Sequence, residues 1–235
     1  MRSLSLAICI FLSSSAFASA SPSLACEKKW GELEIYGKLL KRYRLRAENF
    51  PEGKHFRLYV KWYNGEEAEM LSYSANHKGH LILEMPEKKK DPFYALCPLK
   101  RGERIEFFMR SEEDSAVMVH ASVVPFPNDL KTPSGIKLSL ELQSHAGDRF
   151  LLRGEGFQPG ETLEVNCQYQ TQLTNYATEA TADGVIEVPV RLELKENESG
   201  EALLILRRPS EKIAFPFQVG EPALEIAGAC CLEFR

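Results

Sequence analysis

Leu45-Arg46-Ala47-Glu48-Asn49-Phe50-Pro51-Glu52-Gly53-Lys54 is the stretch that decides the fold, and the chain uses it again as Leu152-Arg153-Gly154-Glu155-Gly156-Phe157-Gln158-Pro159-Gly160-Glu161. Leu152 stands 107 positions after Leu45, and Gly160 stands 107 positions after Gly53. Each copy reads as the end of a strand, an aromatic residue, a Pro/Gly turn and the start of another strand. A repeat at this spacing predicts two similar domains in tandem.

The first domain is expected to consist of strands. In one segment Leu58, Val60 and Trp62 share a face, while Tyr59 and Tyr63 lie on the other, as alternation in a strand requires. Turn residues such as Asn64-Gly65 separate the segments. The expected strands are Trp30–Tyr36, Tyr43–Ala47, Phe56–Tyr63, His80–Met85, Arg104–Arg110 and Val117–Val124.

The second domain repeats this order after a proline-containing linker, residues 128–134. The turns 74–79 and 180–184 correspond, as do the glycines at 102 and 200. The expected strands are Ile136–Leu142, Phe150–Gly154, Thr162–Tyr169, Val185–Leu194, Ala202–Arg207 and Ile213–Val219. We therefore predict an all-β chain of two tandem immunoglobulin-like antiparallel β-sandwich domains, residues 27–127 and 135–221, followed by a tail, residues 222–235, that packs on domain 2 or on a partner.

The first 20 residues have the pattern of a cleavable signal peptide. Arg2 precedes the apolar run Leu4–Leu12, and Ala18-Ser19-Ala20 fits a signal-peptidase site. The run is shorter than the roughly 20 residues that cross a bilayer, and no other stretch is long and apolar enough. The sequence thus predicts a secreted or periplasmic protein without a transmembrane segment. Ser23-Leu24-Ala25-Cys26 is a poor lipobox, so lipidation at Cys26 is a minor alternative.

The net charge is unevenly distributed. Residues 27–127 carry 18 Lys/Arg against 16 Asp/Glu, and residues 128–235 carry 10 against 17. The whole chain has a formal charge of −4. Because binding to a phosphate backbone needs a basic surface, this balance excludes nucleic acid as the main partner.

Five cysteines remain after the signal peptide, namely Cys26, Cys97, Cys167, Cys230 and Cys231. All five are disulfide candidates because an exported chain meets an oxidising compartment. We favour Cys26–Cys97 in domain 1 and Cys167 with Cys230 or Cys231, although the sequence leaves the connectivity open. An odd number leaves one thiol free, modified or paired between chains, which would make a disulfide-linked dimer.

The turn Gly154-Glu155-Gly156-Phe157-Gln158-Pro159-Gly160-Glu161 resembles that of bacterial extracellular immunoglobulin-like repeats, including the IPT/TIG type. Domain 1 departs from this motif, since Ala47 and Asn49 replace both glycines. The resemblance covers one short turn per domain. It implies an immunoglobulin-like fold and a role as spacer, adhesion module or interaction platform, and it carries over no catalytic residue.

Candidates for chemistry are few. His77-Lys78-Gly79-His80 is the one closely spaced histidine pair, but it sits in an expected turn without further ligands, and structural zinc usually has four. The sequence contains no Gly-x-Ser-x-Gly elbow and no phosphate-binding glycine loop between a strand and a helix. We expect no enzyme activity, no cofactor and no metal site.

A basic and aromatic face of domain 1 is the candidate partner patch. Arg42, Arg44 and Arg46 alternate with Tyr43 and Leu45, so a strand places three guanidinium groups on one face. Tyr59 and Tyr63 are candidates for an aromatic platform. Alternatively, these residues form a solvated strand and a half-buried sheet.

We therefore expect a non-catalytic secreted or periplasmic protein of the cell envelope that acts through contacts with a protein or a cell-surface component. The alternative is a carbohydrate-binding or adhesin module that binds an acidic glycan with this domain 1 face.

Overall fold

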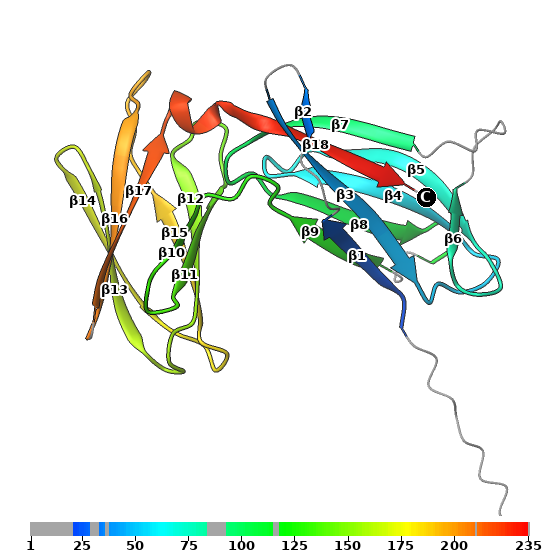
Figure 1. The fold of residues 1–235 in the computed structure, drawn as a ribbon, viewed down its shortest axis with the longest axis horizontal. Helices are drawn as coiled ribbons and strands as arrows, with labels where there is room; N and C mark the ends of the chain where they lie inside the picture. The colour runs from blue at the N-terminus through cyan, green and yellow to red at the C-terminus, as the bar shows by residue number, and fades with distance from the viewer. Residues whose placement is uncertain are drawn as a thin grey trace, which may run out of the picture.

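The computed structural model describes residues 21–28, 33–35, 38–83, 93–114, 118–209 and 211–234. Within this part of the chain the regular elements are 18 strands and one short 3-10 helix, Glu221–Leu224 (η1). The strands form two β-sandwiches that lie side by side (Figure 1). The prediction of an all-β chain with two immunoglobulin-like sandwiches is thus confirmed. The predicted signal peptide, residues 1–20, lies outside the described residues.

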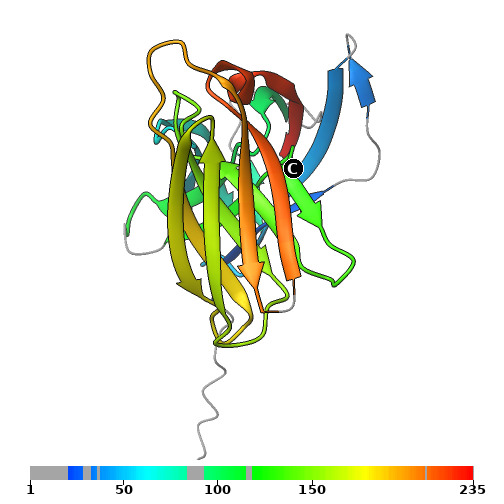
Figure 2. The same cartoon turned by 90° about the vertical axis from the view of Figure 1, so that its left-hand side faces the viewer.

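Domain 2 is a sandwich of two four-stranded sheets, β10-β11-β12-β15 and β14-β13-β16-β17. Figure 2 shows the second of these sheets toward the viewer. Its strands are β10 (Asp129–Lys131), β11 (Lys137–Leu142), β12 (Arg149–Glu155), β13 (Thr162–Tyr169), β14 (Gln172–Glu179), β15 (Val185–Arg191), β16 (Gly200–Arg208) and β17 (Glu211–Val219). In β17, Ile213, Phe215, Phe217 and Val219 are buried and alternate with exposed residues, so their strand points one face at the core. The domain has its own hydrophobic core.

Domain 1 is also a sandwich, with sheets of five strands each. Its strands are β1 (Ser23–Lys28), β2 (Leu33–Ile35), β3 (Lys38–Glu48), β4 (His55–Trp62), β5 (Glu67–Ala75), β6 (Leu81–Leu83), β7 (Phe93–Lys100), β8 (Ile105–Ser111), β9 (Met118–Val123) and β18 (Ile226–Phe234). One sheet has the order β6-β5-β4-β8-β9, and the other has the order β1-β3-β18-β7, with β2 on β3. Phe56, Leu58, Val60 and Phe107 belong to a core separate from that of domain 2.

The internal repeat is visible in the backbone hydrogen bonds of the two opening turns. Phe50 N–H donates to Gly79 O at 3.1 Å, and Phe157 N–H donates to Gly184 O at the same distance. Gly53 N–H donates to the carbonyl of residue 75 at 2.9 Å, as Gly160 N–H does to that of residue 180 at 3.0 Å. The repeated sequence therefore builds the same turn in both domains, and β3, β4 and β8 correspond to β12, β13 and β16. β7 takes the position of β15 in the strand order, because each directly precedes the strand that pairs with β4 or β13.

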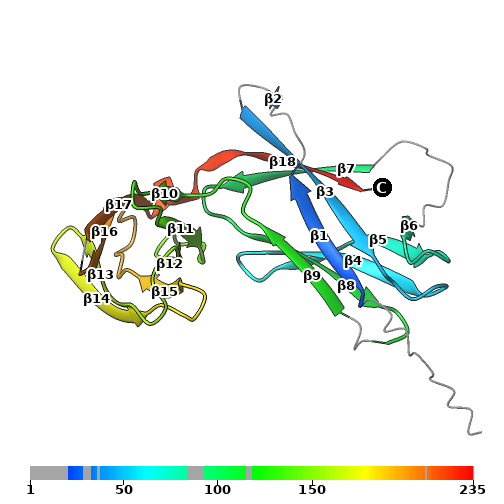
Figure 3. The same ribbon diagram turned by 60° about the horizontal axis from the view of Figure 1, so that its bottom comes forward.

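The C-terminal strand β18 breaks this correspondence. In domain 2, β12 and β15 pair directly in antiparallel register. In domain 1 their counterparts β3 and β7 are separated by β18, which runs parallel to β3 and antiparallel to β7 (Figures 1 and 3). The expectation that the tail packs on domain 2 or on a partner holds for its first residues, since Ala223 of η1 lies in the domain 2 core and Leu224 packs against it. It is wrong for β18. After η1 the chain returns to domain 1 and completes its sheet.

Several other elements differ from the sequence-based expectation. Strands β1, β5, β7 and β14 were not expected, and β10 lies inside the predicted linker, where it pairs with β11. Pro98, Pro189 and Pro216 lie in β7, β15 and β17, each of which stands at the end of its sheet order. Proline lacks the N–H that an interior strand must donate, so these positions are compatible with the ladders.

Candidate interaction surfaces

The three arginines of the candidate patch do lie together on β3. Tyr43 is buried and Leu45 packs against the domain 1 core, so Arg42, Arg44 and Arg46 face outward. The guanidinium of Arg46 lies 2.6 Å from Glu48 Oε1 and 3.4 Å from Glu27 Oε1. The hydrogen bond with Glu48 raises the pKa of Arg46. Carboxylates therefore offset part of the positive charge of this face.

The two candidate tyrosines are not part of the arginine face. Tyr59 lies on β4, in the other sheet of the sandwich, and its neighbours Leu58 and Val60 point into the core. Its side chain is therefore on the opposite outer face from the arginines. Tyr63 follows β4 and contacts His145 of domain 2. The structure thus distributes the five candidate residues over three places.

Tyr59 belongs to a stack of aromatic and basic side chains that the sequence did not reveal. Its ring stacks on Phe108 with centroids 5.3 Å apart and an interplanar angle of 9°. The Arg110 guanidinium lies over both rings, 5.0 and 4.7 Å from their centroids. Phe108 is only 6% exposed because these neighbours cover it. The sequence feature that could have indicated this stack is the run Phe107-Phe108-Met109, in which Phe108 breaks the alternation of buried residues.

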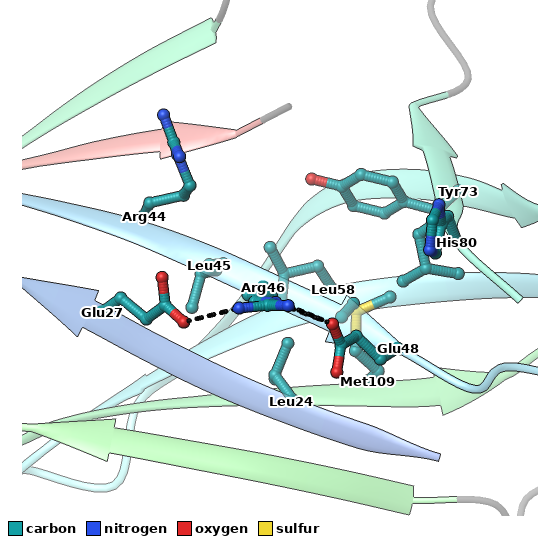
Figure 4. A pocket seen from close by; sticks show the side chains of 12 residues that line it. Leu24, Glu27, Arg44, Leu45, Arg46, Glu48, Leu58, Tyr73, His80 and Met109 are labelled. Carbon is teal, nitrogen blue, oxygen red and sulfur yellow. Dashed lines mark hydrogen bonds and ion pairs between the residues drawn. The ribbon is translucent and has the colours of Figure 1, made fainter. Parts of the chain in front are cut away.

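A pocket opens beside the arginine face (Figure 4). Its volume is about 400 Å³. Leu58 of β4 and Met109 of β8 lie at its floor, whereas Arg46, Glu27 and Glu48 form an ion-paired rim. An apolar floor with a charged rim suits an apolar group that carries a polar end.

The junction between the domains contains a buried carboxylate. Glu141 of β11 is 3% exposed, and its Oε2 accepts a hydrogen bond from Arg104 Nε of domain 1 at 2.8 Å. Arg153 Nε of β12 lies 2.9 Å from Glu141 Oε1. The Arg153 guanidinium also donates to Glu187. A buried charge needs such partners, so this cluster ties the two domains together.

Backbone contacts reinforce the junction. Gly102 N–H donates to Phe126 O at 2.7 Å, and Leu142 N–H of domain 2 donates to Gly102 O at 3.0 Å. Gly102 has φ +77°, and a Cβ there would stand 2.6 Å from Leu140 O. Glycine is therefore required by both the backbone conformation and the close approach of β11.

A second polar cluster surrounds Tyr63. Lys100 Nζ donates to the Tyr63 hydroxyl at 2.6 Å, and that hydroxyl lies 3.2 Å from His145 Nδ1. Glu103 is 4% exposed and accepts the backbone N–H of Lys100 at 2.9 Å. Burial raises the pKa of Glu103. Tyr63 is thus a junction residue, in contrast to the sequence-based interpretation of an aromatic platform.

The edge strand β14 is an exposed surface of a different kind. It pairs with β13 on one side and has no strand on the other, and Leu173 is 56% exposed. A shallow groove of about 630 Å³ runs along it. There the Tyr176 hydroxyl accepts the backbone N–H of Arg191 in β15 and donates to the backbone carbonyl of the same residue. Its sequence, Gln172–Glu179, contains no proline and no basic residue. Edge strands usually carry a proline or a charged residue such as lysine, which prevents pairing with another strand.

The histidine pair lies where the sequence placed it. His77 and His80 are exposed in the turn between β5 and β6, where the Asn76 side chain accepts the backbone N–H groups of Lys78 and His80. Among the described residues no group of three or more His, Cys, Asp or Glu is arranged to hold a metal ion.

The cysteines do not pair as expected. Cys26 lies in β1 and packs against the domain 1 core, and Cys167 is buried in the domain 2 core. Both are free thiols, so Cys26–Cys97 and a bond from Cys167 to the tail are not formed. Burial raises the pKa of Cys26 to about 12 and that of Cys167 to about 11, which keeps both thiols protonated at neutral pH.

Comparisons with known proteins show no family for this chain. No protein-family model and no curated protein matches the sequence. Among solved structures, a tetra-tandem repeat from the extending region of a large adhesion protein is 11% identical, covers 85% of this chain and has a TM-score of 0.28. This chain spans about half of that one, 49%. The chicken interferon gamma receptor alpha chain is 11% identical, covers 86% of this chain and is itself covered completely, with a TM-score of 0.27.

These values are too low to carry an argument, so the immunoglobulin-like assignment rests on the strand order given above. None of the helices in the described part of the chain has the length and apolar character that a membrane span requires.

Proposed function

We propose that this chain is a non-catalytic protein of the cell envelope or the extracellular space, and that it binds a protein partner by strand addition at the free edge of β14. The observation that carries the proposal is the unprotected edge itself. An extended segment of a partner can pair with the exposed backbone of β14, because main-chain hydrogen bonds supply affinity without a deep pocket.

The other long edge strands of the described sheets show why β14 stands out. β7, β15 and β17 each contain a proline, and β6 and β10 are only three residues long. β9 and β1, the ends of their sheets, lie close to each other, whereas β14 contacts β15 of the opposite sheet less extensively. The side chains of Leu173, Asn175 and Ala177 are exposed along β14. A partner strand would meet no proline and no lysine or arginine of β14 there, and the one charged residue of the strand, Glu179, is at its end.

The rigid junction supports a binding role. Glu141 and Gly102 fix domain 1 against domain 2, so the β14 edge is held in one orientation relative to the rest of the molecule. A pre-organised surface loses less conformational entropy when it binds. The alternative of an acidic glycan on a basic and aromatic face has less support, since Arg42, Arg44 and Arg46 lie on the opposite outer face from Tyr59.

The test uses a phage-displayed library of random peptides as the probe. The reduced and the oxidised protein are each panned, and binding of enriched peptides is measured by interferometry. Two added charges in Leu173→Lys/Ala177→Lys should weaken binding by about tenfold or more, because an edge lysine must be desolvated when a strand is added. The matched control, Ala214→Lys/Gln218→Lys, adds the same charge at exposed positions of β17, the other edge of the same sheet.

The control variant should bind the peptides as the wild type does. Peptides that bind both variants equally, or a library that yields no binder for the wild type, would overturn the proposal. Circular dichroism of both variants shows whether the sandwich is retained.

A further inference from the structure

The strand β18 depends on its two neighbours for every ladder hydrogen bond. It is joined to domain 2 through η1 and the turn at Glu225, and it enters the domain 1 sheet between β3 and β7. Since β3 and β7 do not pair with each other, withdrawal of β18 would leave two open strand edges inside one sheet. A covalent tie between β18 and a neighbour would prevent this.

The backbone register places two cysteines opposite each other in that sheet. Cys230 of β18 is the register partner of Cys97 of β7 in an antiparallel pair. Opposed residues in such pairs have Cα atoms about 4.5 or 5.5 Å apart, depending on the hydrogen-bonding position. Both spacings lie within the range of about 4.4–6.8 Å that a disulfide spans.

The two positions also share one face of the sheet. Leu99 and Gly228 are register partners and both are buried. Because Cys97 and Cys230 stand two residues away from them along β7 and β18, alternation puts both on this core side. Cys231 is opposite Leu96 and falls on the other face. The register therefore singles out Cys230, and not its neighbour, as the match for Cys97.

We propose that Cys97 and Cys230 form a disulfide that locks the C-terminal strand into the domain 1 sheet. The two thiols lose two protons and two electrons in forming the S–S bond. A small-molecule disulfide such as oxidised glutathione accepts both electrons by thiol–disulfide exchange, through a mixed disulfide, and leaves as two thiols. Because the small-molecule disulfide is the electron acceptor, the reaction needs no redox cofactor bound to the protein.

The bond closes a loop that contains the whole of domain 2. Cross-links that close long loops restrict the unfolded chain most, so the expected effect on stability is large. Cys26 and Cys167 stay reduced, since both are shielded and have raised pKa values.

The experiment oxidises the reduced full chain in a glutathione redox buffer, blocks the remaining thiols with N-ethylmaleimide and maps the disulfides by mass spectrometry after proteolysis. Wild type and Cys231→Ser should yield the same cross-linked peptide containing Cys97. Cys230→Ser and Cys97→Ser should not yield it. Oxidation should raise the melting temperature by about 5 °C in the first two proteins and leave it unchanged in the last two.

Cys231→Ser is the matched control because it removes the adjacent thiol on the same strand. Absence of the cross-link from oxidised wild type would overturn the inference, and so would a Cys97 cross-link that survives Cys230→Ser and disappears in Cys231→Ser. The peptide map of wild type and Cys231→Ser gives the answer even if a serine variant at position 97 or 230 fails to fold. The outcome is independent of peptide binding at β14.

Discussion

The two domains share one repeat but close their first sheets differently. In domain 2, β12 and β15 form a ladder of seven residue pairs, from Arg149↔Arg191 to Glu155↔Val185. In domain 1 the matching strands β3 and β7 each pair with β18 instead. Domain 2 therefore contains all of its strands in one continuous segment, whereas domain 1 needs a strand that follows domain 2 in the sequence.

This difference shows that two domains with matching turns need not both contain all the strands of their own sheets. The turns at Phe50 and Phe157 have matching hydrogen bonds, yet only the second belongs to a module that is self-sufficient in its strands. The pocket beside Arg46 occurs in the domain that borrows a strand. We expect domain 1 to be the less stable unit whenever β18 is absent.

Removal of β18 should have the largest effect on this comparison. A chain that stops after Glu225 loses the backbone ladders to β3 and β7, and each lost hydrogen bond contributes about 1 kcal/mol. Calorimetry should show domain 1 unfolding at a much lower temperature, while domain 2 keeps its transition. A single transition at the wild-type temperature would show that β18 is dispensable and that the contrast between the domains is wrong.

A smaller effect is expected at the carboxylate that joins the domains. Glu141→Gln leaves Arg104 and Arg153 without their shared buried anion, which should destabilise the protein by about 2–4 kcal/mol. The matched control is Glu155→Gln, because Glu155 lies 3.9 Å from Lys137 in an exposed pair. That change should cost less than about 1 kcal/mol.

Urea unfolding followed by tryptophan fluorescence and circular dichroism measures both variants. If Glu141 couples the domains, its variant should also separate the two unfolding transitions. Equal stability of the two variants would contradict the role of Glu141 in the junction.

The smallest predicted effect concerns pH and a pair of repeat-related glutamates. Glu103 is buried at the junction, whereas Glu201, its counterpart after Gly200, is exposed. The folded-state pKa of Glu103 is raised by burial, so the folded state favours the protonated carboxyl, and stability falls as pH rises through its titration. Glu103→Gln should therefore raise the melting temperature at pH 7 relative to wild type, with little difference at pH 4.

Glu201→Gln serves as the control and should leave the melting temperature unchanged at both pH 4 and pH 7. Thermal melts of the three proteins across this pH range give the comparison. A gain from Glu103→Gln that is the same at pH 4 and pH 7 would show that titration of Glu103 is not its cause.

The sequence predicted the fold where the signal was local. The turn residues around Gly53 and Gly160 and the alternation in β4 and β17 each report a conformation within a few residues. Strand β14 was missed because an edge strand with Gln172, Thr174 and Asn175 shows no apolar alternation. Strand β18 was read as a tail because its partners β3 and β7 lie far away in the sequence, and no local pattern encodes such pairing.

The candidate site was predicted less well for a similar reason. Alternation correctly placed Arg42, Arg44 and Arg46 on one face, but it could not show which sheet would carry Tyr59. No local pattern singled out Glu103 or Glu141, because their burial arises only when domain 2 docks against the turn at Gly102.

The placement of β18 also sets an order of assembly. During synthesis from the N-terminus, β1 to β9 emerge before domain 2, and β18 emerges after it. Domain 2 can then fold before β18 is available to complete the domain 1 sandwich. Arrival of β18 after domain 2 thus completes the domain 1 sheet, and a chain interrupted before β18 would expose an unfinished sheet to proteases and chaperones.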